Sequence, residues 1–226
     1  MAEIGIVMLD NRIPRPVGDV GNPASFDFPV AMAVAAGADT RQVVEHSAAG
    51  LLPTVTEAAT ALQKDGAAAV TTCCGFLAVY QRELADELDV PVATSSLLQV
   101  PLVLRTLRRD QSVCVLTANA STLTDAHLEA VGIGPSMRPR VRLTGLEHTE
   151  HFFPVVTGDG ASLDVGRAEA EVVAVARAAV ATHPDIGAFV LECTNLPPYS
   201  GAVKAATGRP VWDALTLIGW LRGGTS

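Results

Sequence analysis

The stretches AAAVTTCCG at residues 67–75 and IGAFVLECT at residues 186–194 are the strongest indication of the fold. Each begins as a short apolar run and leads to a cysteine, Cys74 in the first and Cys193 in the second. Each of these cysteines stands 17 residues before a Pro-Val pair. The repeat predicts a duplicated unit that places one thiol at the same point in each half, so that the two thiols face a shared cleft.

The composition is typical of a helix-rich α/β protein. Apolar residues make up 49% of the 226 residues and aromatic residues only 4%, so Ala, Val and Leu dominate a chain long enough to bury a substantial core. The net charge of −8 argues against nucleic acid as a partner, because a nucleic-acid-binding protein needs a cationic surface to displace phosphate counterions.

The sequence also predicts a cytoplasmic location without a membrane partner. No apolar run reaches the ~18 residues of a membrane span, and the first residues lack a basic region and a cleavage site. Four cysteines are too few for a disulfide framework in a chain of this length, so we expect reduced thiols.

Apolar runs and periodic segments alternate along the chain. Apolar, β-branched runs predict strands at 4–9, 43–48, 67–72, 91–93, 112–116, 141–146, 186–191 and from Val211 onward. Apolar residues at helical spacing predict helices at 54–64, 76–88, 97–109, 121–131, 167–181 and 215–221. Two long segments, 11–29 and 147–163, read as loops, and loops of this length are often functional.

Strands that alternate with helices favour parallel sheets covered on both faces. The fold class is therefore α/β, with two pseudo-symmetric lobes, each a parallel sheet flanked by helices, and the active site between them. We expect an N-terminal lobe at 1–98 and a C-terminal lobe at 99–211, with the closing helix at 212–226 packing back on the first lobe. Ligands of open α/β sheets bind at the carboxyl ends of the strands, which is where Cys74 and Cys193 fall.

Two opposed thiols suit proton transfer at a carbon beside a carboxylate or carbonyl, because one can act as base and the other as acid. We expect the N-terminus of the following helix to lower the pKa of Cys74. By strand alternation, Cys73 and Glu192 should point away from the cleft. Cys114 lies within a predicted strand and is expected in the core.

The motifs TTCCGF at residues 71–76 and ECTN at residues 192–195 resemble the two cysteine motifs of the aspartate/glutamate racemase superfamily. That superfamily includes amino-acid and hydantoin racemases, maleate isomerases, arylmalonate decarboxylases and dimethylsulfoniopropionate lyases. The resemblance implies two parallel-sheet lobes, a small anionic substrate held between Cys74 and Cys193, no cofactor, and a homodimer or higher homo-oligomer. Glutamate racemases have Asn-Thr after the first cysteine and His two residues after the second, where this chain has Gly75-Phe76 and Asn195, which favours another branch.

Candidate substrate-binding residues surround the thiols. Gly75, Thr194 and Asn195 adjoin them in the two motifs. Thr117 and Asn119 lie between a predicted strand and a predicted helix, where side chains and helix-start N–H groups can hold a carboxylate. The alternative for this segment is an ordinary helix cap.

The predicted loops and strand ends supply further candidates. Asp10 ends the first strand and either binds an ammonium group or forms a turn, while Arg12 and Arg15 can reach a carboxylate from the 11–29 loop. The cluster at 147–151 contains two histidines and two glutamates and is expected near the cleft mouth. The metal-ligand spacings that mark zinc sites are absent from the sequence, so no metal is predicted.

We therefore predict a cofactor-independent racemase or isomerase that uses Cys74 and Cys193 as opposed acid and base on a small, amino-acid-like substrate. The first alternative is a lyase on the same scaffold, in which one thiolate takes a proton and a leaving group departs. The second is a small-molecule binding protein that keeps the cleft without turnover, and the third is a thiol-redox protein that uses Cys73 and Cys74.

Overall fold

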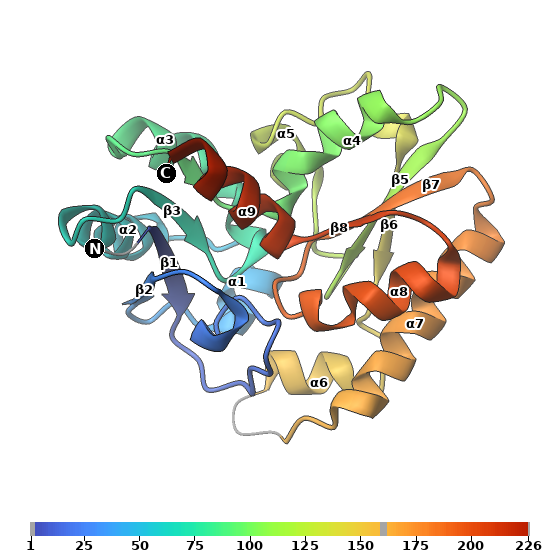
Figure 1. Cartoon of the computed structure of the whole chain (residues 1–226), viewed down its shortest axis with the longest axis horizontal. Helices are drawn as coiled ribbons and strands as arrows, with labels where there is room; N and C mark the ends of the chain where they lie inside the picture. Colours follow the sequence, from blue (N-terminus) through green and yellow to red (C-terminus); the bar gives the residue numbers. More distant parts are fainter. Residues whose placement is uncertain (1–2, 159–161, 226) are drawn as a thin grey trace.

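Within residues 3–158 and 162–225, which the computed structural model describes, the strands form two four-stranded sheets in which every pairing is parallel. The first sheet has the order β2-β1-β3-β4 and the second has the order β6-β5-β7-β8. The second sheet repeats the first strand for strand, and Figure 1 shows the two sheets beside each other. The predicted fold class is confirmed.

The strands of the first sheet are β1 (Ile4–Leu9), β2 (Val30–Ala35), β3 (Ala69–Thr72) and β4 (Val92–Ala93). Those of the second are β5 (Ser112–Thr117), β6 (Val141–Gly145), β7 (Ile186–Leu191) and β8 (Val211–Trp212). The central strands β5 and β7 are buried at every residue, which explains their continuous apolar sequence.

The α-helices are α1 (Thr40–Glu45), α2 (Leu52–Lys64), α3 (Gln81–Glu87), α4 (Val100–Thr106), α5 (Asp125–Ala130), α6 (Phe152–Thr157), α7 (Val165–Thr182), α8 (Ser200–Thr207) and α9 (Ala214–Thr225). Short 3-10 helices are η1 (Pro23–Ser25), η2 (Gly75–Tyr80), η3 (Ser96–Gln99), η4 (Arg138–Arg140) and η5 (Pro197–Tyr199). Among the described residues, no helix has the length and apolar character needed to cross a membrane.

Two predicted elements are wrong. Residues 43–48 were expected to form a strand, but α1 occupies this region because Asp39 caps it by accepting the N–H of Gln42. The expected 147–163 loop contains α6. The predicted helix at 121–131 is also shorter than expected, since α5 begins at Asp125 after a Thr124 cap.

Two apolar cores lie on the two faces of the second sheet. Val113 and Val115 of β5 join one large core that extends through the first sheet. Cys114 and Leu116, which alternate with them, belong to a second core with α7 and α8. The first core thus contains residues of both sheets.

The closing helix α9 packs against β3 and β4 of the first sheet, and it also contacts β8. Figure 1 shows it, in dark red, next to the first sheet. The domain boundaries at residues 98 and 211 stay predictions.

Candidate active site

A narrow cleft of about 20 Å³ opens at the carboxyl ends of the two sheets' central strands. Its walls are residues 73–76, which follow β3, and residues 192–195, which follow β7. Residues of the 11–29 loop, of α1 and of α6 complete the lining. The segments that the repeat matched in the sequence therefore meet in one place.

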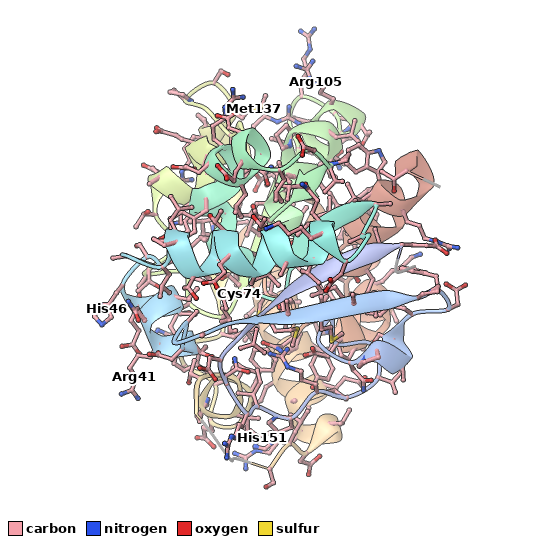
Figure 2. The ribbon with its side chains drawn as sticks, turned by 90° about the vertical axis from the view of Figure 1, so that its left-hand side faces the viewer. Arg41, His46, Cys74, Arg105, Met137 and His151 are labelled. Carbon is pink, nitrogen blue, oxygen red and sulfur yellow. The ribbon has the colours of Figure 1, made fainter. Side chains whose placement is uncertain are left out.

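Both predicted thiols line this cleft. Cys74 is half-buried and precedes η2, and Cys193 has 8% of its surface exposed. All four cysteines are free thiols. Figure 2 labels Cys74 near the middle of the view.

Burial dominates the electrostatics of the two thiols. It raises the pKa of Cys74 well above its usual value, and the Glu192 carboxylate raises it further, while the N–H of Phe76 acts in the opposite direction. Burial and then Glu192 likewise raise the pKa of Cys193, against the N–H of Asn195. The expected lowering of the Cys74 pKa by a helix N-terminus is therefore wrong, because desolvation of the thiolate outweighs the helix-start N–H.

Glu192 lines the cleft, although strand alternation predicted that it would point away. Alternation holds only as far as Leu191, where β7 ends, and the chain turns at the next residues. Thr117 Oγ donates a 2.6 Å hydrogen bond to Glu192 Oε2, whereas Glu192 Oε1 has no partner among the described residues. Burial raises the pKa of Glu192 to about 7, against the Thr117 hydrogen bond.

Cys73 also lines the cleft, contrary to expectation. It lies just beyond β3, and the N–H of Leu9 donates to its sulfur over 3.1 Å. Burial raises its pKa, and the guanidinium of Arg15 acts against this. The segment after β3 is thus held by β1 and by the 11–29 loop.

The 11–29 loop contributes an ion pair that the sequence analysis only partly anticipated. Arg15 lines the cleft and pairs with the buried carboxylate of Asp19 at 2.9 Å. Asp19 in turn accepts a 2.6 Å hydrogen bond from the amide of Asn195. Burial disfavours the charge of Arg15, but Cys73 and Asp19 together hold its pKa above the usual value. In the sequence, the one feature that could have indicated a role for Asp19 is an acidic residue within a loop rich in glycine and proline.

The remaining predicted site residues divide into two groups. Gly75, Thr194 and Asn195 line the cleft, as expected for residues that adjoin the thiols. The hydroxyl of Thr194 donates to the carbonyl of Cys73, which joins the two cysteine segments directly.

Four other predicted residues are not among the described residues that line the cleft. Asp10 is exposed and accepts the N–H of Gly37, and Arg12 is exposed. Thr117 lies behind the cleft and holds Glu192. Asn119 accepts hydrogen bonds from the N–H and hydroxyl of Ser121, so it organises its own turn.

The cluster at 147–151 also lies outside the described lining of the cleft. His151 accepts the N–H of Asp164 at the start of α7, and Figure 2 shows it at the rim of the molecule, away from Cys74. The nearby α6 reaches the cleft instead, through Val156 and Thr157. Among the described residues, no group of three or more His, Cys, Asp or Glu side chains is placed to hold a metal.

A second groove of about 530 Å³ lies between α4 and α9. Its described lining is mostly apolar and contains glutamines and threonines but no acidic, basic, histidine or cysteine side chain. It therefore offers no group for proton transfer, and the cysteine cleft is the candidate active site.

No model of a protein family matches the chain, but individual proteins do. A dimethylsulfoniopropionate lyase from Durusdinium sp. clade D is 32% identical over 220 residues, covering 95% of this chain and 72% of the relative. Dimethylsulfoniopropionate lyase 5 of Emiliania huxleyi is 32% identical over 232 residues, covering 95% of this chain but 44% of the relative. The chain thus spans less than half the length of that relative.

Solved structures share the fold at lower identity. Arylmalonate decarboxylase superposes with a TM-score of 0.56 at 21% identity, covering 98% of this chain and 92% of the other. An aspartate racemase homologue from Pyrococcus horikoshii superposes with a TM-score of 0.59 at 15% identity, covering 100% and 99%. The chain belongs to the aspartate/glutamate racemase superfamily and, within it, to the family of these dimethylsulfoniopropionate lyases.

Proposed function

We propose that the protein is a lyase that removes a proton beside a carboxylate and expels a neighbouring leaving group, with dimethylsulfoniopropionate as the first substrate to test. The observation that carries this proposal is the meeting of Cys74 and Cys193 in one buried cleft. The paired cysteine motifs alone favour a racemase, with a lyase on the same scaffold as the alternative. The relatives that cover most of this chain are dimethylsulfoniopropionate lyases, which favours the lyase.

The proposed reaction needs one thiolate. It takes the proton from the carbon next to the carboxylate and becomes a thiol. The electron pair left on that carbon forms the double bond, and the bond from the next carbon to sulfur breaks. Its electrons leave with the sulfur, so the products are neutral dimethyl sulfide and acrylate. Cys74 and Cys193 are the candidates for this base.

The cleft carries charges of both signs for such a substrate. Arg15 is the cation among its described lining residues and suits a carboxylate, because a guanidinium can hold both oxygens. The thiolate of Cys74 or Cys193 supplies the negative charge that offsets the positive charge of a sulfonium. Gly75, Thr194 and Asn195 stay proposals as contacts to the substrate.

Racemase chemistry is the second candidate, because elimination needs only one base whereas this cleft holds a thiol from each repeat. Two opposed thiols can remove a proton from one face of a carbon and return one to the other. We therefore include aspartate and glutamate in the test.

The test incubates the protein with dimethylsulfoniopropionate in deuterium oxide and follows dimethyl sulfide by gas chromatography and acrylate by proton NMR. Because a positioned base contributes about 10²–10⁴-fold, substitution of the cysteine that acts as the base, by Cys74→Ser or Cys193→Ser, should lower the rate at least 100-fold. Cys114→Ser is the matched control, since that thiol lies in the second core, and it should keep the activity.

Each outcome has a distinct meaning. Dimethyl sulfide and acrylate in equal amounts, lost in at least one of the two cysteine variants, support the lyase. Deuterium exchange into aspartate or glutamate without elimination supports the racemase. Activity that survives both substitutions would overturn thiol chemistry, and inactivity of the folded wild-type protein on every compound would overturn the proposed reaction.

A further inference from the structure

Glu192 is a buried carboxylate at the cleft that the proposed reaction does not require as a base. Its side chain has no exposed surface, and its Oε1 atom has no hydrogen-bond partner among the described residues. An unpaired buried carboxylate oxygen is costly. The burial of Glu192 beside the two thiols therefore indicates a functional role rather than ordinary packing.

The surroundings of Glu192 fix its carboxylate against both halves of the site. Thr117 holds Oε2 from β5. On the other side, a Cβ atom at Gly75 would overlap both Oε1 and the carbonyl oxygen of Glu192. The carboxylate therefore lies directly against the backbone beside Cys74, while Glu192 itself precedes Cys193 in the chain.

This placement makes Glu192 the leading charged neighbour of both thiols, because it is the largest charge effect on Cys74 and on Cys193 alike. Cys73 and Cys193 also act on Cys74, and Asp19 and Arg15 act on Cys193. Arg15 is already paired with Asp19. Among the described residues, Thr117 is the one side chain that donates a hydrogen bond to the Glu192 carboxylate.

We propose that Glu192 controls the formation of a thiolate at the cysteine pair: a negative charge on Glu192 opposes a thiolate at Cys74 or Cys193, and a proton on Glu192 permits one. The cleft then holds one negative charge that three acidic groups share. Glu192 is a positioning residue in this account, because it acts through the thiols. The inference rests on the proposed function for its catalytic meaning.

The test measures thiolate formation directly, in the absence of substrate. Mass spectrometry follows the alkylation of each cysteine by iodoacetamide in buffers between pH 6 and 10, because the thiolate is the form that reacts. In Glu192→Gln, which keeps an oxygen to accept from Thr117, the alkylation rates of Cys74 and Cys193 at a given pH should rise about tenfold or more, because removing a close like charge favours the thiolate. Glu87→Gln makes the same charge change at an exposed position of α3 and should leave these rates unchanged.

A second variant reads the same coupling from the other partner. Thr117→Val removes the hydrogen bond that favours the charged carboxylate, so Glu192 should stay protonated to higher pH and the two thiols should react faster near neutral pH. Circular dichroism checks whether Glu192→Gln folds. If it does not, Thr117→Val still tests the coupling.

Unchanged alkylation profiles in a folded Glu192→Gln protein, or in Thr117→Val, would overturn the inference. The result is independent of turnover. Shifted profiles in a protein without lyase or racemase activity would support the charge coupling and remove the proposed function. Full lyase activity with unshifted profiles would support the proposed function and overturn the charge coupling.

Discussion

Gly75 shows how tightly a single residue can be constrained at this site. Its position has no room for a side chain, because an added Cβ would meet the carboxylate and the carbonyl of Glu192. The carbonyl belongs to the backbone after β7 and cannot move without shifting Cys193. The glycine that follows Cys74 is therefore required by the approach of the second cysteine segment rather than by its backbone angles.

We predict that Gly75→Ala destabilises the protein by about 1–3 kcal/mol, the usual cost of inserting a methyl group into a packed region. It should also lower activity, because the two cysteine segments must separate. Chemical denaturation and the lyase assay measure the two effects.

Gly219→Ala is the matched control. A Cβ there meets no atom within 4 Å, and the residue lies inside α9, so this substitution should stabilise the protein by about 0.5–1 kcal/mol. A Gly75→Ala protein as stable and as active as wild type would contradict the close approach of the two segments.

At the scale of elements, the 11–29 loop is fastened to the second cysteine segment through Asp19. Its carboxylate accepts from Arg15 at 2.9 Å, from the N–H of Gly21 at 2.7 Å and from Asn195 at 2.6 Å. A buried charge that loses its partner is strongly destabilising. Asp19 therefore holds the loop over the cleft, together with the N–H of Val20, which donates to the carbonyl of Thr194.

We predict that Asp19→Asn loosens this loop, because Arg15 keeps its charge in a mostly buried position without the paired carboxylate. Trypsin should then cleave after Arg12 at least tenfold faster, a factor that needs about 1.4 kcal/mol of local destabilisation. Limited proteolysis followed by mass spectrometry measures this rate. Asp27→Asn, an exposed position in the same loop, should cleave at the wild-type rate, and equal rates in both variants would argue against the fastening.

The elements also show what the sequence could and could not predict. The buried central strands were predicted correctly, because apolar residues fill both faces of each. The strand predicted at 43–48 was wrong. Val43 and Val44 are typical of strands, but the Asp39 cap and packing into the large core favour the helix α1. Propensity over six residues is too weak to decide against such tertiary contacts.

The same limit applies to the site. The two thiols were found because the repeat places them at equivalent strand ends, which the sheet order then brings together. Cys73 and Glu192 were misplaced because alternation of side chains was extended past Thr72 and Leu191, where the strands end. Asp19 depends on a contact with Asn195, 176 positions away, and no local pattern reports such a contact.

At the scale of the whole molecule, the large core links the two sheets. Val113 and Val190 of the second sheet pack in the same cluster as Ile6 and Val70 of the first. With so much shared apolar surface, we expect the two halves to unfold together in one cooperative transition. A buried ionisable group anywhere in this unit then influences the stability of the whole chain.

Glu192 supplies such a group, and it sets our last prediction. Its pKa in the folded protein is about 7, above the ordinary value of 4.5, so the folded state binds this proton more tightly than the unfolded state. Its stabilising contribution is therefore fully present below pH 4.5 and is lost as the pH rises through 7. The loss is on the order of 3 kcal/mol at 1.36 kcal/mol per pKa unit.

Urea titrations at a series of pH values between 5 and 8.5 give the free energy of unfolding and test this contribution. Glu192→Gln carries no titrating proton, so its stability relative to wild type should rise across that range by a few kcal/mol. Subtracting the two curves cancels the titration of groups that the proteins share. A difference that stays constant with pH would show that Glu192 is charged throughout, and the carboxylate would then oppose a thiolate at every pH in the range.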